Sequence, residues 1–314
     1  MKKVEKKMIK KVAVLVGGMG AEREVSINTG NSFIKALKEL PYEYFVVDAK
    51  EDLPRQLMDL RPDVALLALH GKYAEDGTVQ GICEYLKIPY TGSGVLASAL
   101  TMHKIMCKDL FVRHKIPTAE YEAHDLKRTE AQEIKTKITL PLVVKPSREG
   151  SSVGITICTE KSQILPAIKC AGEYDHLILI EKFIDGMELT VPIFRGKAIA
   201  PIEIVPKTSF YDYTRKYTKG ATEYFLPPRL DEKVVNQAKE IALKVFELLE
   251  LRFYSRIDFR VRDNKEPLVL EVNPLPGCTE TSLVPKSAAF ENISFKEFVN
   301  QLVESATLDY EGLK

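Results

Sequence analysis

The alternation of apolar and polar segments predicts a parallel α/β unit at the start of the chain. Short apolar runs at 12–16, 44–47 and 64–69 have the length and composition of buried strands. Two helical segments separate these runs, one beginning at Ser26 as an N-cap and one at 53–60. Strands and helices in alternation predict a parallel sheet, whose ligand crevice lies at the carboxyl ends of its strands.

Polar residues at two of these strand ends are candidates for binding. Glu22 follows the glycine-rich turn after the first strand, and His70 follows the third strand. The turn at 17–20 together with Asp48 resembles part of a dinucleotide-binding fingerprint. The fingerprint is incomplete, because Arg23 stands at its third glycine and Asp48 lies further along the chain than the pattern expects. A nicotinamide-dependent oxidoreductase is therefore a distant alternative.

A Gly/Ser-rich loop in the middle of the chain is a candidate anion-binding site. Apolar segments at 141–144 and 153–157 predict two strands, and the loop 145–154 joins them. Such a loop exposes backbone N–H groups to an anion, and Lys145 adds a point charge. It is not a Walker A loop, since no lysine follows its second glycine and no helix follows the loop. A long polar hairpin is the alternative.

The strand predicted at 177–180 ends in residues suited to a nucleoside. An adenine needs backbone hydrogen bonds at a strand end and an apolar wall, and the ribose hydroxyls need a carboxylate. Residues 181–184, with Glu188 beyond them, supply both kinds of contact.

The segment 206–228 is polar, aromatic and basic, and it follows neither the strand period nor the helix period. A loop of this length inside a compact domain is usually functional and often a lid. Lys216 and Tyr217 lie near its middle, where a closed lid would bring them over phosphates and substrate. Its aromatic residues argue against the alternative of a disordered excursion. An amphipathic helix is predicted after it, at 230–251.

A predicted hairpin near the end of the chain is a candidate metal site. Strands at 256–261 and 268–273 are joined by a polar loop, and antiparallel pairing would place Asp258, Glu271 and Asn273 side by side. Three hard oxygen ligands suit Mg²⁺, which fills the rest of its shell with phosphate oxygens and water. The alternative is a hairpin with a merely hydrated polar face.

Composition is ordinary for a soluble globular protein and limits the partners. Of 314 residues, 45% are hydrophobic and 28% are charged, and the length suffices for two or three domains. The net charge of +1 gives no electrostatic basis for binding nucleic acid or an anionic membrane. The lysine-rich segment 1–11 precedes an apolar run too short for a signal peptide, and no run reaches membrane-spanning length. Five scattered cysteines fit reduced thiols in a cytoplasmic enzyme.

Sequence blocks from Val12 to about Ala306 resemble the ATP-grasp superfamily and, within it, the D-alanine–D-alanine ligase family. They occur in the order that the family shows, so together they are far more specific than any one alone. The blocks are Gly-Gly-Met-Gly-Ala-Glu-Arg-Glu-Val-Ser (17–26), Ala-Leu-His-Gly (68–71), Glu-Asp-Gly-Thr-Val-Gln-Gly (75–81), Tyr-Thr-Gly-Ser-Gly (90–94), Lys-Pro-Ser-Arg-Glu-Gly-Ser-Ser-Val-Gly (145–154), Tyr-Asp-Tyr-x-x-Lys-Tyr (211–217), Arg-Ile-Asp (256–258) and Ser-Leu-Val-Pro (282–285).

The resemblance implies an α/β fold with a three-domain ATP-grasp architecture. A parallel-sheet N-terminal domain that binds substrate would cover 1–103, and a central ATP-grasp domain would cover 104–187. A C-terminal ATP-grasp domain at 188–314 would carry the metal site and the lid, at about 206–228. The central and C-terminal α+β domains would clamp ATP between their sheets.

The resemblance also implies a reaction, its co-substrate and its metal. ATP phosphorylates one D-alanine, and the amine of a second attacks the acylphosphate. The products are ADP, phosphate and the D-alanyl-D-alanine used for peptidoglycan precursors. Asp258, Glu271 and Asn273 would hold two Mg²⁺ ions, with Mn²⁺ as a substitute. The residues that would contact ATP are Lys104, Lys145, Glu181, Lys182, Ile184, Glu188 and Lys216.

Residues from two blocks would hold the first D-alanine, and two further blocks would supply partners of one of these residues. Glu22 would bind its ammonium group, with His70 beside it. Ser151 and Tyr217 would join Glu22 in a hydrogen-bonded set that bridges the first domain, the central domain and the lid. Tyr217 at this lid position is what the family shows when the second substrate is D-alanine rather than D-lactate.

The second half of the reaction would use residues around the metal hairpin. Arg256 and the Gly277 amide would stabilise the oxyanion of the tetrahedral intermediate, and Ser282 with Leu283 would hold the carboxylate of the second D-alanine. The chain departs from the family at Pro274-Leu275 and at Cys278, which we expect to be a small apolar filler. We expect these departures to leave metal binding unchanged, whereas they could alter the preference between similar substrates.

Two further function classes stay open. One is an ATP-grasp ligase with D-lactate or D-serine as its second substrate, and the other is a nucleotide-binding regulator without activity. The regulator is the weaker alternative, because a pure binder has no need of an oxyanion arginine such as Arg256. The resemblance further implies a homodimer in the cytoplasm, with D-alanine and ATP as its partners and no nucleic acid or membrane.

Overall fold

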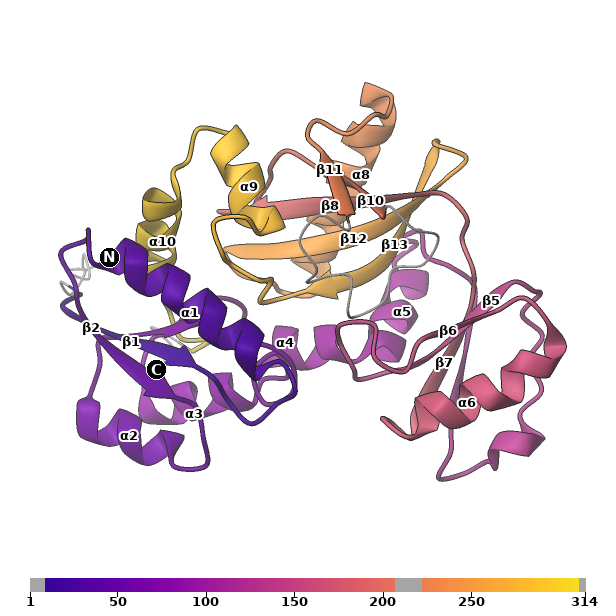
Figure 1. Ribbon diagram of the computed structural model, residues 1–314, viewed down its shortest axis with the longest axis horizontal. Helices are drawn as coiled ribbons and strands as arrows, with labels where there is room; N and C mark the ends of the chain where they lie inside the picture. The colour runs from indigo at the N-terminus through magenta and orange to yellow at the C-terminus, as the bar shows by residue number, and fades with distance from the viewer. Residues whose placement is uncertain (1–8, 207–221, 311–314) are drawn as a thin grey trace.

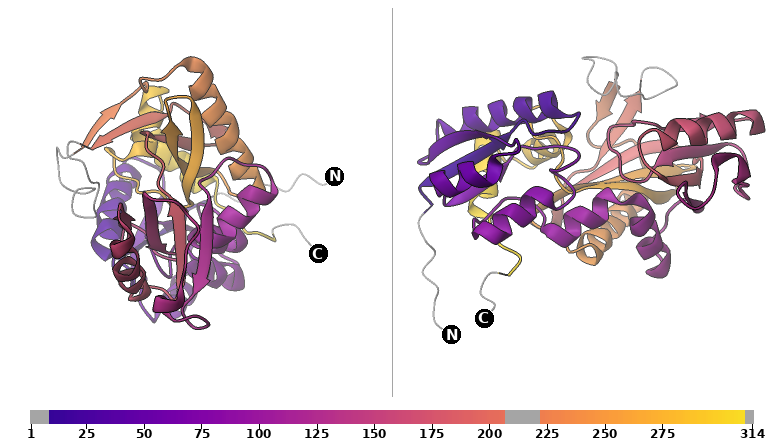
Figure 2. Two further views of the ribbon diagram at one scale, coloured as in Figure 1. Left: turned by 90° about the vertical axis from the view of Figure 1, so that its right-hand side faces the viewer. Right: turned by 90° about the horizontal axis from the view of Figure 1, so that it is seen from below.

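A computed structural model of the protein describes residues 9–206 and 222–310. Three sheets succeed one another along its long axis, and the view from below in Figure 2 shows the same succession. Lys216, Tyr217 and most of the predicted lid lie outside the described residues.

The first sheet is parallel, as predicted, and has the order β2-β1-β3. Its strands are β1 (Lys11–Val16), β2 (Glu43–Asp48) and β3 (Val64–Leu67). The sequence forms them because each strand is an apolar run, and β1 and β3 are buried almost throughout. In Figure 1, α1 lies on one side of the sheet, with α2 and α3 on the other. These helices are α1 (Arg23–Leu37), α2 (Leu53–Leu60) and α3 (Thr78–Leu86).

The helix start predicted at Ser26 is wrong. Helix α1 begins at Arg23, with Glu22 in the N-cap position. Ser26 is fully buried, and its hydroxyl donates to the carbonyl of Ala68 over 2.7 Å, which ties the helix to the chain after β3. The helix therefore extends to the glycine-rich turn and carries Glu22 at its tip.

Two helices from the end of the chain complete the core of the first sheet. They are α9 (Leu283–Phe290) and α10 (Phe295–Glu304). Phe298 is fully buried in the same cluster as Phe33 of α1, and the rings of Phe33 and Phe295 stack at a centroid distance of 6.4 Å. Residues from both halves of the sequence thus build one core.

The central sheet is antiparallel and has the order β4-β7-β5-β6. Helix α6 (Ile164–Gly172) supplies the other half of its core. The return strand predicted at 153–157 forms only at β6, because Ser151, Ser152 and Gly154 have positive φ angles and turn the chain first. The strands are β4 (Tyr121–Asp125), β5 (Leu142–Pro146), β6 (Thr156–Cys158) and β7 (Leu177–Lys182), with short 3-10 turns at Ala131–Glu133 and Lys161–Gln163.

The third sheet is antiparallel, with the order β11-β10-β8-β12-β13 and β9 paired to β8. Helices α4 (Val95–Met102), α5 (Lys104–Arg113) and α8 (Glu232–Leu248) share its core. The predicted hairpin is confirmed, with a register shift between Asp258 and Phe259. The strands are β8 (Met187–Phe194), β9 (Lys197–Ala198), β10 (Ile202–Pro206), β11 (Thr222–Phe225), β12 (Tyr254–Arg262) and β13 (Glu266–Asn273).

Within the described ranges, no helix is both long enough and apolar enough to cross a membrane.

Candidate active site

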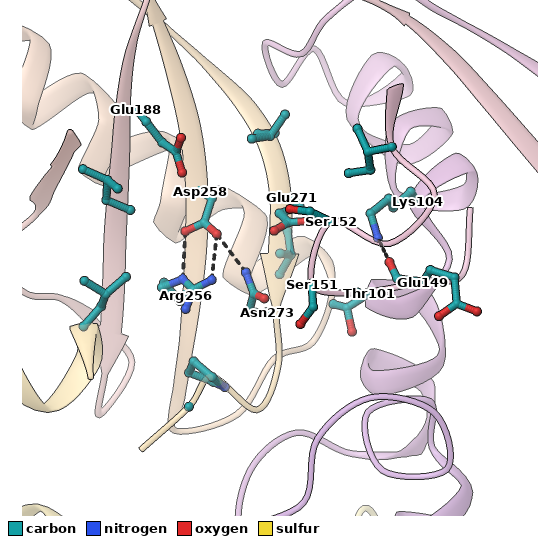
Figure 3. Close-up of a pocket in the computed structure, with 18 of the residues that line it drawn as sticks. Thr101, Lys104, Glu149, Ser151, Ser152, Glu188, Arg256, Asp258, Glu271 and Asn273 are labelled. Atoms are coloured by element: carbon teal, nitrogen blue, oxygen red, sulfur yellow. Dashed lines mark hydrogen bonds and ion pairs between the residues drawn. The ribbon is translucent and has the colours of Figure 1, made fainter. Parts of the chain in front are cut away.

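A cavity of about 1180 Å³ lies where the three sheets meet. In Figure 3, one wall is the strand pair that carries Arg256, Asp258 and Glu271, and the facing wall carries Ser151 and Lys104. The volume is sufficient for a nucleotide together with small substrates.

The hairpin wall is organised around the buried carboxylate of Asp258. Arg256 donates to both of its oxygens over 2.9 Å, and the side-chain nitrogen of Asn273 donates to Oδ2 over 3.0 Å. The hydroxyl of Thr190, on β8, donates to Oδ1 over 2.6 Å. Sequence reasoning missed Thr190, although a lone polar residue in the apolar segment of β8 was an available signal.

These residues fit a divalent cation. Asp258 lies directly opposite Glu271 in the strand register, and Asn273 follows Glu271 on the same face. Because the nitrogen of Asn273 faces Asp258, its amide oxygen is directed away and can serve as a ligand. The described chain holds no cluster of three or more His, Cys, Asp and Glu suited to a metal, and the candidate set here is two carboxylates with one amide. Two carboxylates and an amide oxygen are hard ligands of the kind that Mg²⁺ takes.

The nucleotide residues expected on the central sheet include a buried ion cluster. Glu181, predicted to contact the nucleoside, lines the cavity, and its carboxylate is paired with the ammonium group of Lys145 and with that of Lys108, at 2.8 Å from the latter. Burial alone would raise the pKa of Glu181, but the two lysines lower it to about 2. Sequence reasoning missed Lys108, since nothing in the pattern of α5 distinguishes it from a surface lysine.

Two other predicted nucleotide lysines have defined hydrogen bonds. Lys104, the first residue of α5, donates to the carbonyl of Glu149 in the Gly/Ser-rich loop. The ammonium group of Lys182 is bound to the carbonyls of Thr139 and Leu140, each at 3.0 Å. The side chain of Lys182 is therefore tied to the segment before β5, and the residue lines the cavity at the end of β7.

The last two predicted nucleotide residues line the cavity from the start of the third sheet. Ile184 is buried in a small apolar cluster with Ala119 and Leu268, as an apolar wall for a base requires. Glu188 lines the cavity and pairs with Arg260 at 3.3 Å.

The predicted first-substrate residues also come together. The hydroxyl of Ser151 donates to Glu22, which links the Gly/Ser-rich loop to the tip of α1. Gly71 approaches the other Glu22 oxygen so closely that a Cβ atom there would lie 2.7 Å from it. His70 is buried and contacts Thr29 at 2.9 Å through Nε2.

Glu75 is a cavity residue that sequence reasoning did not assign. Its carboxylate lies 3.6 Å from Nδ1 of His70, and burial raises the pKa of this carboxyl group. The Glu-Asp-Gly block at 75–77 contained the signal, but its function cannot be read from the sequence alone. Glu75 therefore adds an acidic group to the end of the cavity that holds Glu22.

The predicted second-substrate residues occupy the turn into α9. Ser282 is the N-cap of this helix, and its hydroxyl accepts the backbone N–H of Thr279 over 2.9 Å. Gly277 is close by, since a Cβ atom at this position would lie 3.7 Å from the Ser282 hydroxyl. Leu283 starts the helix, and all three line the cavity.

The departures from the family pattern are accounted for by packing. Leu275 is 1% exposed in the core of the first sheet, and its carbonyl contacts Nδ1 of His70 at 3.2 Å. Cys278 is buried in the same core, which confirms that it is an apolar filler, and burial raises the pKa of its thiol. Both residues join the β12–β13 hairpin to the first sheet.

The dinucleotide alternative is not supported by the structure. Arg23 donates to both oxygens of Asp48 over 2.7 Å each, so the carboxylate that would bind a ribose is already paired. This hydrogen bonding lowers the pKa of Asp48 to about 2.

Comparison with known proteins places two family models on the chain. The model described as D-ala D-ala ligase C-terminus matches residues 110–304, and the one described as D-ala D-ala ligase N-terminus matches 49–93. Among curated relatives, D-alanine–D-alanine ligase of Citrifermentans bemidjiense is 45% identical over 97% of this chain and 99% of the relative. That of Geobacter sulfurreducens is 42% identical over 96% of each.

Solved structures show the same similarity. D-alanine–D-alanine ligase from Bacillus anthracis complexed with ATP has a TM-score of 0.81 and 33% identity, covering 94% of this chain and 97% of that one. VanG D-Ala:D-Ser ligase from Enterococcus faecalis has a TM-score of 0.82 and 27% identity, covering 95% of this chain and 99% of that one.

Proposed function

The chain belongs to the D-alanine–D-alanine ligase family, and we propose that it joins two D-alanines in an ATP-dependent reaction that releases ADP and phosphate. The observation that carries this proposal is the single cavity that gathers the hairpin carboxylates, the Lys145 end of the central sheet and the Glu22 end of α1. The product would be the dipeptide used for peptidoglycan precursors.

The architecture that supports this function is an ATP-grasp clamp. The central and third sheets would hold ATP between them, within domains at 1–103, 104–187 and 188–314. The buried wall at Ile184 suits the base, and Glu188 suits the ribose hydroxyls. Lys216 of the lid would reach the terminal phosphate.

The first step transfers the terminal phosphoryl group of ATP to the carboxylate of one D-alanine. Lys104 and Lys145 would position the phosphates, and Glu22 with His70 would hold the amino acid. Asp258, Glu271 and Asn273 would hold two Mg²⁺ ions, and Mn²⁺ could replace them. The bound ions would neutralise part of the phosphate charge. Thr190 would keep the Asp258 carboxylate oriented, because it donates to Oδ1.

The second step is attack by the amine of the other D-alanine on the acylphosphate. A tetrahedral oxyanion forms and expels phosphate, and Arg256 with the Gly277 amide would stabilise its charge. Ser282 and Leu283 would hold the carboxylate of the incoming D-alanine at the turn into α9. Tyr217 in the lid favours D-alanine there.

One observation favours a second candidate for the incoming substrate. The D-Ala:D-Ser ligase with a TM-score of 0.82 shows that this fold accommodates another second substrate. D-Serine would occupy the same place near Ser282. A homodimer is proposed from the family.

Phosphate release with Mg-ATP and D-alanine tests the proposal, with the products identified by mass. We expect phosphate with D-alanine alone and a dipeptide mass, and none with L-alanine. If phosphate is released only when D-alanine is mixed with D-serine or D-lactate, the second substrate is that compound and not D-alanine. Tight ATP binding without turnover would replace the ligase by a nucleotide-binding regulator.

A further inference from the structure

Three charged side chains form a buried cluster behind the nucleotide end of the cavity, and Lys108 is the member without an assigned role. Lys108, Lys145 and Glu181 are 2%, 3% and 2% exposed. The carboxylate of Glu181 lies between the two ammonium groups, with one oxygen toward each. This set is called the buried charge cluster below.

The Lys108 ammonium group has three oxygen neighbours. It donates to the hydroxyl of Thr118 over 2.8 Å and to the carbonyl of Ala119 over 3.3 Å, and it forms an ion pair with Oε2 of Glu181 at 2.8 Å. The Thr118 hydroxyl donates in turn to the carbonyl of Val269 over 2.8 Å. Lys108 is therefore fixed in place by groups on the central sheet and, through Thr118, on the third.

The path from Lys108 reaches the metal hairpin. Val269 lies on β13, two residues before Glu271, and its N–H donates to the carbonyl of Pro117 over 2.8 Å. The segment 117–119 is thus bonded to β13 on one side and to Lys108 on the other. Among described residues, Lys145 and Glu181 line the cavity and Lys108 does not.

Charge gives this arrangement its function. Two lysines and one carboxylate leave the cluster with one surplus positive charge, and only Lys145 presents it to the cavity. Without Lys108, the carboxylate of Glu181 would have Lys145 as its one cationic partner, and the pair would be neutral. A neutral Lys145–Glu181 pair attracts phosphate less strongly than Lys145 does when Lys108 neutralises the charge of Glu181.

We propose that Lys108 is a positioning residue for nucleotide binding: it matches the charge of Glu181, so that the charge of Lys145 is available to the phosphates of ATP. The inference rests on the proposed function, in which Lys145 contacts those phosphates. Lys108 itself touches no substrate. The net positive charge of the buried charge cluster is thereby located at Lys145, on the wall of the cavity.

The variant Lys108→Met tests the proposal in the full-length enzyme. We expect the KM for ATP to rise about tenfold or more, the effect of weakening one charge-assisted hydrogen bond. The kcat at saturating ATP should change much less. Affinity for ADP, measured by calorimetry, should fall in parallel, whereas affinity for adenosine should not change, because adenosine carries no phosphate.

Two further variants separate charge matching from simple packing. Lys108→Met with Glu181→Gln removes both of these charges, so the positive charge of Lys145 again has no counter-charge in the cluster. The ADP affinity, taken relative to the adenosine affinity of the same variant, should then exceed that of Lys108→Met alone. This double variant also leaves no buried carboxylate with a lost partner, so it serves if the single variant does not fold. Lys233→Met is the control, since it removes an exposed lysine from α8. It should change neither the KM for ATP nor the affinity for ADP.

The outcomes distinguish the inference from the function on which it rests. A wild-type KM for ATP in folded Lys108→Met would overturn the positioning role. So would a double variant whose ADP affinity is no better than that of the single variant, or an equal loss of adenosine and ADP affinity. Absence of ATP-dependent phosphate release by the wild-type enzyme would instead overturn the proposed function.

Discussion

The charged residues around the cavity are held by partners that lie largely on other elements of the chain. Asp258 is bound by Arg256 on its own strand, by Asn273 on the next and by Thr190 on a third. Such partners fix a carboxylate in one orientation before any ligand arrives, which lowers the cost of ordering it on binding. Glu181 is fixed similarly, by lysines on α5 and β5.

At the residue scale, Glu271→Gln should abolish ADP release. The substitution keeps the shape of the side chain but removes the charge that a divalent cation requires. Glu266→Gln on the same strand is the matched control, because that carboxylate is exposed and pairs with Arg262. ADP release and far-UV circular dichroism give the two measurements. Activity in folded Glu271→Gln would contradict the metal assignment.

The pKa of Glu181 predicts a dependence of stability on pH. Its carboxyl group has a pKa of about 2 in the folded protein, against an ordinary value of 4.5. Between these values the unfolded chain binds a proton that the folded chain does not, so this contribution to stability is present above pH 4.5 and is lost as the pH falls toward 2. Urea unfolding measured between about pH 5 and pH 3 should show that the free energy of unfolding falls more steeply with pH for wild type than for Glu181→Gln. Equal slopes would show that the cluster does not hold the carboxylate ionised.

At the scale of single elements, the packing of α1 on β1 decides where Glu22 lies. The helix reaches the sheet closely at Gly30, where a Cβ atom would lie 2.2 Å from Cγ1 of Val16. A side chain at this position would push the helix and its tip outward. The sequence pattern predicts the helix but contains no signal for this contact, because it depends on how two elements meet.

Gly30→Ala should therefore destabilise the protein, by about 1 to 3 kcal/mol for overpacking. It should also weaken D-alanine binding, since α1 carries Glu22. Gly81→Ala is the opposite case, because no atom lies within 4 Å of the added Cβ and the residue is inside α3. That substitution should stabilise by roughly 0.5 to 1 kcal/mol. Thermal unfolding measures both effects. A Gly30→Ala variant as stable as wild type would refute the packing argument. Adding Val16→Ala to Gly30→Ala should relieve the overpacking.

At the scale of the whole molecule, two contacts join the first unit to the Gly/Ser-rich loop of the central sheet. The hydroxyl of Ser151 donates to Glu22, and the ammonium group of Lys72 pairs with Glu149. Glu22, Glu149 and Ser151 also line the cavity, so these contacts connect its wall from the first unit to the Gly/Ser-rich loop.

Ser151→Ala should lower kcat/KM for D-alanine by about tenfold or more, because the Glu22 carboxylate loses a hydrogen bond worth about 1.5–3 kcal/mol. Ser152→Ala is a close control, since the neighbouring residue also has a positive φ angle and lines the cavity. Steady-state kinetics with varied D-alanine checks both. Equal effects in the two variants would argue that loop conformation, not the Glu22 contact, is responsible.

Local elements could be predicted from the sequence, whereas contacts between them largely could not. The β12–β13 hairpin and the parallel first sheet follow from apolar runs of strand length, and both are confirmed. Strand pairing then places Asp258 opposite Glu271, as predicted. Lys108 was missed because a buried polar residue has the same local pattern as an exposed one, and Thr190 and Glu75 were missed because their local signals do not specify a role. Their roles arise only when distant segments pack together.

The packing of α10 on α1 has a consequence for protein synthesis. Residues 295–304 emerge from the ribosome long after residues 23–37, so the apolar side of α1 around Phe33 has no permanent cover while the nascent chain grows. A folding intermediate with an open first unit is expected at this stage, and its exposed apolar surface is what molecular chaperones recognise. The cavity, whose lining includes Leu283 and Lys286 of α9, can therefore be complete only after translation has passed that helix.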